Sequence, residues 1–107
     1  MPEENSIVEI VVYRIKADAR EAYVSEALER FRKLVMSFDG FIRYDVFEGC
    51  RDKNEFVDFV QWESLEQAEA AAKAVKQLQQ APEYANYLTA FEKLDIFTHV
   101  RKIRSWA

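Results

Sequence analysis

Hydrophobic residues recur along this chain with two periods, one of two residues and one of three to four, which are typical of strands and amphipathic helices respectively. Residues 7–16, IVEIVVYRIK, are rich in β-branched side chains and apolar on both alternating faces, which predicts a central strand covered on each side. Residues 41–48 and 55–63 predict two more strands joined by a hairpin at GCRDKN, and 94–103 predicts the last strand.

The first helix is predicted between residues 18 and 38. Asp18 and Glu21 have the spacing of a capping box, and Gly40 suits the left-handed position that follows a helix. Apolar residues at spacings of four, three, four and three predict a single buried stripe, made of Val24, Leu28, Phe31, Val35 and Phe38.

The second helix follows a strand that ends in a tryptophan. Ser64 directly after Trp62 and Glu63 predicts an N-cap, with Gln67 at the reciprocal position of a capping box. Pro82 interrupts the helix near residue 80, and a short third helix is predicted after it. Small side chains along the buried stripe either let the helix lie close to a sheet or leave room beside it: Ala68, Ala71, Ala72, Val75 and Leu78.

The order β-α-β-β-α-β predicts an α+β, ferredoxin-like fold, in which a four-stranded antiparallel sheet carries its helices on one face. The opposite face is left uncovered, and we expect it to pair with a second copy of the chain in a homodimer. Strand alternation places mostly apolar side chains there: Val8, Ile10, Val12, Ile42, Tyr44, Val46, Val57 and Phe59.

Length and composition narrow the class of protein. The chain of 107 residues predicts one domain over 1–107, with a core of about 7–103, and a 50% hydrophobic content argues against disorder. A net charge of −4 gives no general attraction to nucleic acid or anionic membrane. The start, MPEENS, lacks the regions of a signal peptide and no run is apolar enough to span a membrane, so we expect a cytoplasmic protein. Cys50 is the sole cysteine and is expected to be an exposed turn thiol.

Three stretches together resemble one family. They are DGF at 39–41, QWESLEQAEA at 61–70, and PEY at 82–84. Their order and spacing over residues 7–103 resemble the antibiotic biosynthesis monooxygenase (ABM) family of dimeric α+β barrel proteins. The resemblance implies a dimer of face-to-face sheets and a pocket between the sheet and the helices of each subunit.

The resemblance also implies several possible activities. Members of the family include oxygenases that oxidise phenolic polycyclic or quinol substrates without metal or flavin, haem-degrading relatives, and many proteins without an assigned activity. The haem-degrading branch pairs a tryptophan, here Trp62, with an asparagine on the first strand, where this chain has Val11, and with an iron-ligating histidine that this chain lacks between Trp62 and Phe97. We therefore expect no haem and no other cofactor.

Cofactor-independent oxygenation needs a base, a dry pocket and hydrogen bonds for the substrate anion. If Trp62 faces the helices, alternation puts Asp58 beside it, and Arg43 and Asp45 are candidates for the same face. We assign Asp58 as the base, Arg43 as an anion stabiliser and His99 as a proton-transfer group. The residues assigned to substrate binding are aromatic: Tyr13, Trp62, Tyr84 and Tyr87.

Structural roles stay open for the same residues. Arg43 can pair with Asp45 or Asp58, Trp62 can fill the core, and a single strand histidine is often structural. No carboxylate or cysteine cluster has metal-ligand spacing, and the basic HVRKIR at 99–104 more plausibly keeps an edge strand soluble or crosses to the partner subunit than binds nucleic acid. Two functions follow: a monooxygenase of a small aromatic or quinone-type compound, and a non-catalytic dimeric small-molecule-binding module.

Overall fold

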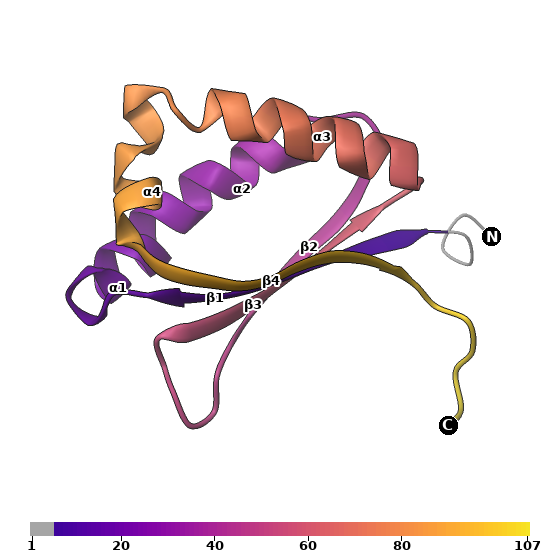
Figure 1. Cartoon of the computed structure of the whole chain (residues 1–107), viewed down its shortest axis with the longest axis horizontal. Helices are drawn as coiled ribbons and strands as arrows, with labels where there is room; N and C mark the ends of the chain where they lie inside the picture. The colour runs from indigo at the N-terminus through magenta and orange to yellow at the C-terminus, as the bar shows by residue number, and fades with distance from the viewer. Residues whose placement is uncertain (1–5) are drawn as a thin grey trace.

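The computed structural model describes residues 6–107, and its four strands form one antiparallel sheet with the helices on a single face (Figure 1). The order β2-β3-β1-β4 confirms the predicted ferredoxin-like arrangement. The signal-peptide prediction for MPEENS lies outside the described residues, apart from Ser6. The strands are β1 (Ile7–Ile15), β2 (Phe41–Glu48), β3 (Glu55–Trp62) and β4 (Phe91–Arg101). The helical segments are η2 (Ala17–Ala19), α1 (Arg20–Ala22), η3 (Tyr23–Ala27), α2 (Leu28–Met36), α3 (Leu65–Leu78), η4 (Pro82–Tyr84) and α4 (Ala85–Ala90).

The last strand begins earlier than predicted, at Phe91 rather than Leu94. Phe91 pairs with Ile15 of β1, and its ring stacks on Tyr13 with the centroids 4.7 Å apart. The sheet thus reaches the end of α4 directly, and the start of β4 lies next to the core.

The first helix contains a π-helical segment, η3, between α1 and α2. Its wider turn keeps residues four apart on one face, so the buried residues are Tyr23, Ala27, Phe31 and Val35. Val24, predicted to be buried, is 43% exposed. The predicted capping box of Asp18 and Glu21 is also wrong, because neither η2 nor α1 begins with a side-chain cap.

The second helix starts as predicted. The backbone N–H of Gln67 donates to Ser64 Oγ at 3.1 Å, and Ala68, Ala71 and Val75 are buried. Leu78 is exposed, contrary to the predicted stripe. Gly40 adopts the predicted left-handed conformation, with φ of +86°, in direct contact with the Gln67 side chain.

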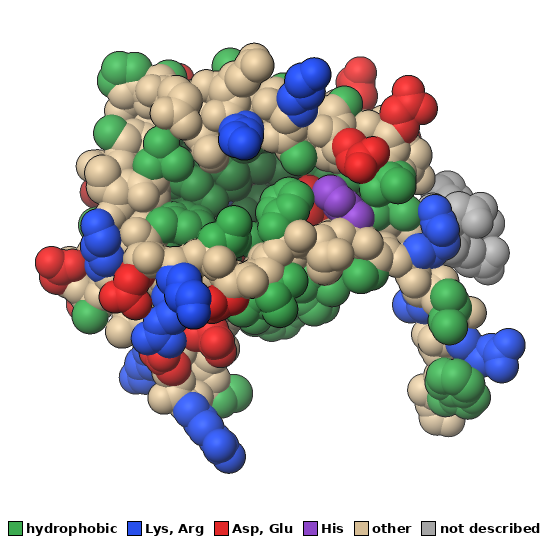
Figure 2. Space-filling view, viewed as in Figure 1, with side chains coloured by type: hydrophobic (Ala, Val, Ile, Leu, Met, Phe, Trp, Pro, Cys, Tyr) green, Lys and Arg blue, Asp and Glu red, His purple; other side chains and the backbone are tan. Residues whose placement is uncertain are grey.

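Strand β2 faces the opposite way from the prediction. A register shift between Phe41 and Arg43 marks a bulge, after which Tyr44 and Val46 pack against the core while Arg43 and Asp45 point away from the helices. The more apolar side of this strand therefore turns inward. Hydrophobic side chains still gather on the uncovered face, beneath β4 in Figure 2, and the exposed ones are Phe47, Phe59, Ile96 and Val100.

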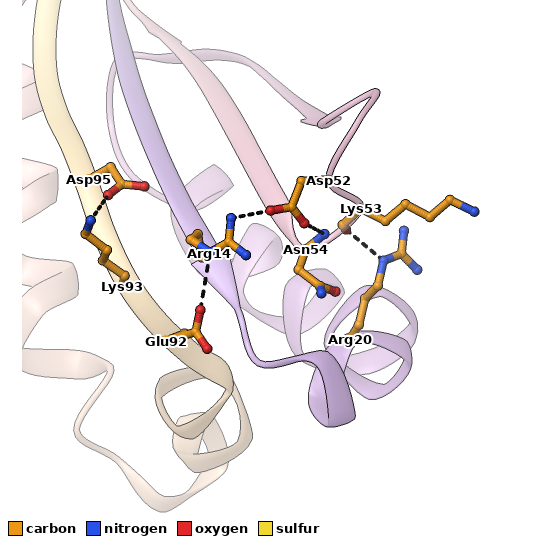
Figure 3. A network of polar contacts seen from close by, with 8 residues as sticks. All are labelled: Arg14, Arg20, Asp52, Lys53, Asn54, Glu92, Lys93 and Asp95. Carbon is orange, nitrogen blue, oxygen red and sulfur yellow. Dashed lines mark hydrogen bonds and ion pairs between the residues drawn. The ribbon is translucent and has the colours of Figure 1, made fainter.

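A polar network ties the β2–β3 turn to the other strands (Figure 3). Arg14 of β1 forms an ion pair with Asp52 in the turn and another, at 3.2 Å, with Glu92 of β4. The hydrogen bonds from the backbone of Asn54 and then from Arg14 lower the pKa of Asp52. Cys50, in the same turn, is a free exposed thiol as predicted.

Candidate functional site

A cavity of about 740 Å³ lies between the sheet and the helices α2, α3 and α4. Figure 2 shows its mouth as a hollow lined by hydrophobic side chains, between α3 above and β4 below. The wall is mostly apolar, and two carboxylates, from Glu9 and Asp58, belong to it. The lining includes Glu9, Tyr44, Asp58, Trp62, Ala72, Lys73, Lys76, Gln79, Tyr87, Leu94 and Phe97.

Asp58 is the central polar group of this cavity. Only 3% of the residue is exposed, and its two carboxylate oxygens accept hydrogen bonds from the hydroxyls of Tyr13 at 2.8 Å and Tyr44 at 2.7 Å. The Tyr13 hydroxyl also bonds the Tyr23 hydroxyl at 2.5 Å. Four side chains from β1, β2, β3 and η3 thus form one buried network that fixes the position of the carboxylate.

Burial raises the pKa of Asp58 to about 6, since removing water disfavours the charged carboxylate. The hydrogen bonds from Tyr44 and Tyr13 lower it, and the nearby Glu9 raises it. Burial, and then the charge of Asp58, also raises the pKa values of Tyr13, Tyr23 and Tyr44, so these hydroxyls remain protonated donors. The site therefore holds a carboxylate able to exchange a proton near neutral pH.

Glu9 and His99 form a second polar pair at the edge of the cavity. They face each other on β1 and β4, and His99 Nε2 lies 3.0 Å from Glu9 Oε1. Burial raises the pKa of Glu9, and the hydrogen bond to His99 lowers it. In Figure 2 the histidine, the only one in the sequence, is visible from outside beside the hollow with a carboxylate next to it. The pair joins the cavity wall to the surface.

Trp62 closes the cavity at the end of β3. It is 1% exposed, and Phe41 packs edge-on against it with the ring centroids 5.9 Å apart. Within the described residues its indole Nε1 is a buried polar atom without a hydrogen-bond partner. A buried donor without a partner is costly, and an acceptor brought by a ligand or a water would satisfy it.

The family model for antibiotic biosynthesis monooxygenases matches residues 6–88. The chain belongs to this family. No curated protein sequence matches it significantly. The match of the family model confirms the resemblance to the ABM family that the sequence showed.

Solved structures show the same fold at low sequence identity. A candidate antibiotic biosynthesis monooxygenase from Bordetella bronchiseptica has a TM-score of 0.76 and 17% identity, with 94% of this chain and 99% of that chain covered. SnoaB, a cofactor-independent oxygenase from Streptomyces nogalater, has a TM-score of 0.64 and 14% identity, with coverage of 95% and 96%. Rv0793 from Mycobacterium tuberculosis has a TM-score of 0.63 and 20% identity, with coverage of 96% and 100%.

The structure brings together most of the residues that the sequence assigned to the ABM site. Asp58, Trp62 and Tyr87 line the cavity, Tyr13 lies directly behind Asp58, and His99 reaches the wall through Glu9. Tyr84 packs against the core from η4 without lining the cavity.

Arg43 lies elsewhere. Its side chain is 70% exposed and pairs with Asp45 at 2.8 Å on the uncovered face of the sheet. The prediction that Arg43 and Asp45 join the cavity was wrong, because the bulge after Phe41 reverses the face on which each of them lies. Arg43 is therefore not positioned to stabilise an anion in this cavity.

Sequence reasoning missed Tyr44 and Tyr23 as parts of the site. Tyr44 was placed on the uncovered face, although β2 alternates Tyr44 and Val46 with Arg43 and Asp45. A prediction that the more apolar side of β2 faces the helices would have placed Tyr44 in the site. No pattern in the sequence predicts that Tyr23 belongs to the site. Tyr23 lies in the π-helical segment η3, and its side chain is buried.

Among residues 6–107, no three or more His, Cys, Asp or Glu side chains gather so as to hold a metal ion. No helix in this part of the chain has the length and apolar character needed to cross a membrane.

Proposed function

We propose that this ABM-family protein is a cofactor-independent monooxygenase that oxidises a small aromatic or quinone-type compound in the cavity. The observation that carries the proposal is Asp58, a carboxylate that is buried in an apolar wall, held by two tyrosine hydroxyls and given a pKa of about 6. Such a group suits a general base acting on a phenol or an enolisable ketone. The description of the similar SnoaB fold as a cofactor-independent oxygenase supports the same class of reaction.

The reaction is written here for anthrone, a tricyclic probe that tautomerises to a phenol. Asp58 accepts the acidic proton, and the resulting carbanion or phenolate gives one electron to O₂. The two radicals recombine to form a carbon-bound peroxide anion, which takes the proton back from Asp58 and becomes a hydroperoxide. Asp58 then removes the remaining C–H proton as the O–O bond breaks, and that proton leaves with the departing hydroxide as water. One anthrone and one O₂ thus yield one anthraquinone and one water.

The other polar groups have distinct roles in this proposal. The Trp62 Nε1–H, which has no partner among residues 6–107, donates to the oxygen that becomes negatively charged on the substrate. Glu9 and His99 exchange protons between the cavity wall and solvent. Tyr13 and Tyr44 are positioning residues, because they hold Asp58 and stay protonated themselves.

We also propose that the protein works as a homodimer. The exposed Phe47, Phe59, Ile96 and Val100 lie on the side of the sheet away from the helices, where burying them against water would stabilise an assembly. The same patch on a second copy provides a self-complementary surface under two-fold symmetry.

Oxygen consumption tests the catalytic proposal. The purified protein is mixed with anthrone in air-saturated buffer, and O₂ uptake and anthraquinone formation are followed together. We expect about 10²-fold or greater loss with Asp58→Asn, since a base typically contributes that factor. The exposed Asp39→Asn serves as the control and keeps full activity. Equal rates for wild type and Asp58→Asn with anthrone and with a hydroquinone would refute the assignment.

A non-catalytic binding module is the second candidate. It is favoured by the fact that both oxygens of Asp58 already have hydrogen-bond donors within the protein, so the carboxylate is also a satisfied structural group. Binding of an aromatic compound with the same affinity in the presence and absence of O₂, without any product, would favour this function.

A further inference from the structure

Polar side chains at the C-terminal end of α3 border the mouth of the cavity. Lys73 and Lys76 of α3 and its C-cap residue Gln79 recur every third residue, and all three belong to the lining. Figure 2 shows basic side chains above the hollow. Lys73 and Lys76 are the only basic residues of α3. On the opposite side the mouth is formed by two large exposed apolar side chains of β4, Leu94 and Phe97.

The two lysines lack an acidic partner in the described part of the chain. Within residues 6–107 neither ammonium group has an ion pair or hydrogen bond. The neighbouring strand differs, because Lys93 of β4 is paired with Asp95 at 3.1 Å (Figure 3). The mouth thus presents two available positive charges next to an apolar wall.

Negative charge is placed deeper. Glu9 and Asp58 line the same cavity from β1 and β3, and their carboxylates disfavour a second anion inside. A ligand with one anionic group therefore gains most when that group stays at the mouth and its apolar part enters.

We propose that the ligand of this cavity is an aromatic compound carrying a carboxylate or a chemically similar anionic group, which lies at the mouth between Lys73 and Lys76 while the ring system fills the apolar interior. A cavity of about 740 Å³ is large enough for such a polycyclic molecule. The proposal rests on the proposed function in so far as it names the class of substrate for the same site.

A matched pair of fluorescent probes tests it. 8-Anilinonaphthalene-1-sulfonate and N-phenyl-1-naphthylamine share one ring system and differ by the sulfonate. Each is titrated into wild type, Lys73→Gln/Lys76→Gln, and the control Lys33→Gln/Lys53→Gln, which removes the same charge outside the cavity. Ala72→Phe, which fills the cavity from α3, identifies the binding that takes place inside it.

We expect the sulfonate probe to bind about fivefold less tightly to Lys73→Gln/Lys76→Gln than to wild type, as two partly solvated ion pairs would give. The uncharged probe should change less than twofold in all lysine variants, and added salt should remove the difference. The control pair should behave as wild type with both probes.

Three outcomes would overturn the proposal: equal changes for both probes, no change for either, or sulfonate binding that Ala72→Phe leaves intact. The titrations need no turnover, so they are independent of the oxygenase proposal. If the protein prefers the sulfonate probe but does not oxidise anthrone, only the oxygenase proposal is contradicted. If it oxidises anthrone but shows no such preference, only the proposal of an anionic ligand is contradicted.

Discussion

The hydroxyl of Tyr44 on β2 donates a hydrogen bond to Asp58 on the adjacent strand β3, with 2.7 Å between the oxygens. Tyr13 of β1 donates to the other oxygen of Asp58 from the opposite side. Burial raises the pKa of this carboxylate, and the two hydrogen bonds lower it. The protonation state of the proposed base is therefore set by three adjacent strands together.

The first prediction concerns the pH dependence of oxidation. A general base must be ionised, so kcat/KM for anthrone should rise as pH increases through the pKa of Asp58, about 6, and level off above it. A pH series under air-saturated conditions measures this. A rate that stays constant down to about pH 4, below the folded-state pKa, would mean that Asp58 is not the base.

Tyr44→Phe should move that pH profile. The substitution removes a donor that favours the charged carboxylate, so the pKa of Asp58 rises and the ascending limb shifts upward by about one pH unit. Tyr84→Phe is the matched control, because Tyr84 neither lines the cavity nor contacts Asp58. An unshifted limb in Tyr44→Phe would contradict the role given to this hydrogen bond.

Asp58→Asn should alter stability in a pH-dependent way. The pKa of Asp58 is higher in the folded state, about 6, than in the unfolded chain, 3.8, so the folded state binds more protons between these values. The free energy of unfolding of wild type therefore falls as pH rises through this window, by about 3 kcal/mol from this group. Asp58→Asn lacks that decrease.

Urea unfolding near pH 4 and near pH 7 measures the difference, with the exposed Asp39→Asn as control. We expect Asp58→Asn to gain stability relative to wild type on going from the lower to the higher pH. The same pH dependence in both proteins would show that the buried carboxylate does not carry it.

Gly40→Ala should destabilise the fold. Gly40 has φ of +86°, and a Cβ there would lie 2.5 Å from the Gln67 side chain at the start of α3. We expect a loss of about 2 kcal/mol in the free energy of unfolding, from the left-handed backbone and the contact together. Adding Gln67→Ala, compared with Gln67→Ala alone, should recover only the part due to the contact with the end of the Gln67 side chain, since the Cβ of residue 67 remains 2.9 Å away. A stable Gly40→Ala protein would contradict both causes.

Phe59→Lys should separate the proposed dimer. Phe59 is 39% exposed on the uncovered face, where a charge would be desolvated against the second copy. Sedimentation should show a dimer for wild type and a monomer for Phe59→Lys at micromolar concentration. Leu65→Lys, at a similarly exposed position on α3, should stay dimeric. A monomeric wild type would rule out the assembly.

Several elements follow from local chemistry that the sequence displays. β2 occupies the predicted residues, Ser64 caps α3, and Gly40 adopts the left-handed conformation. Each depends on neighbours in sequence: side-chain alternation, a hydroxyl near free N–H groups, and the absence of a Cβ. Side-chain alternation along β3 placed Asp58 on the same face as Trp62, and both residues are buried.

The sequence by itself determined the order of strands and helices, the N-cap of α3, the left-handed turn at Gly40 and the family to which the chain belongs, because these depend on residue types at short spacing. Only the tertiary structure decided which side of β2 faces inward, how η3 turns Tyr23 toward Tyr13, and that His99 meets Glu9 across 90 residues of chain. A bulge or a π-helical turn shifts every later side chain by one position, and that shift is settled by packing against distant elements. The site is built from those distant contacts.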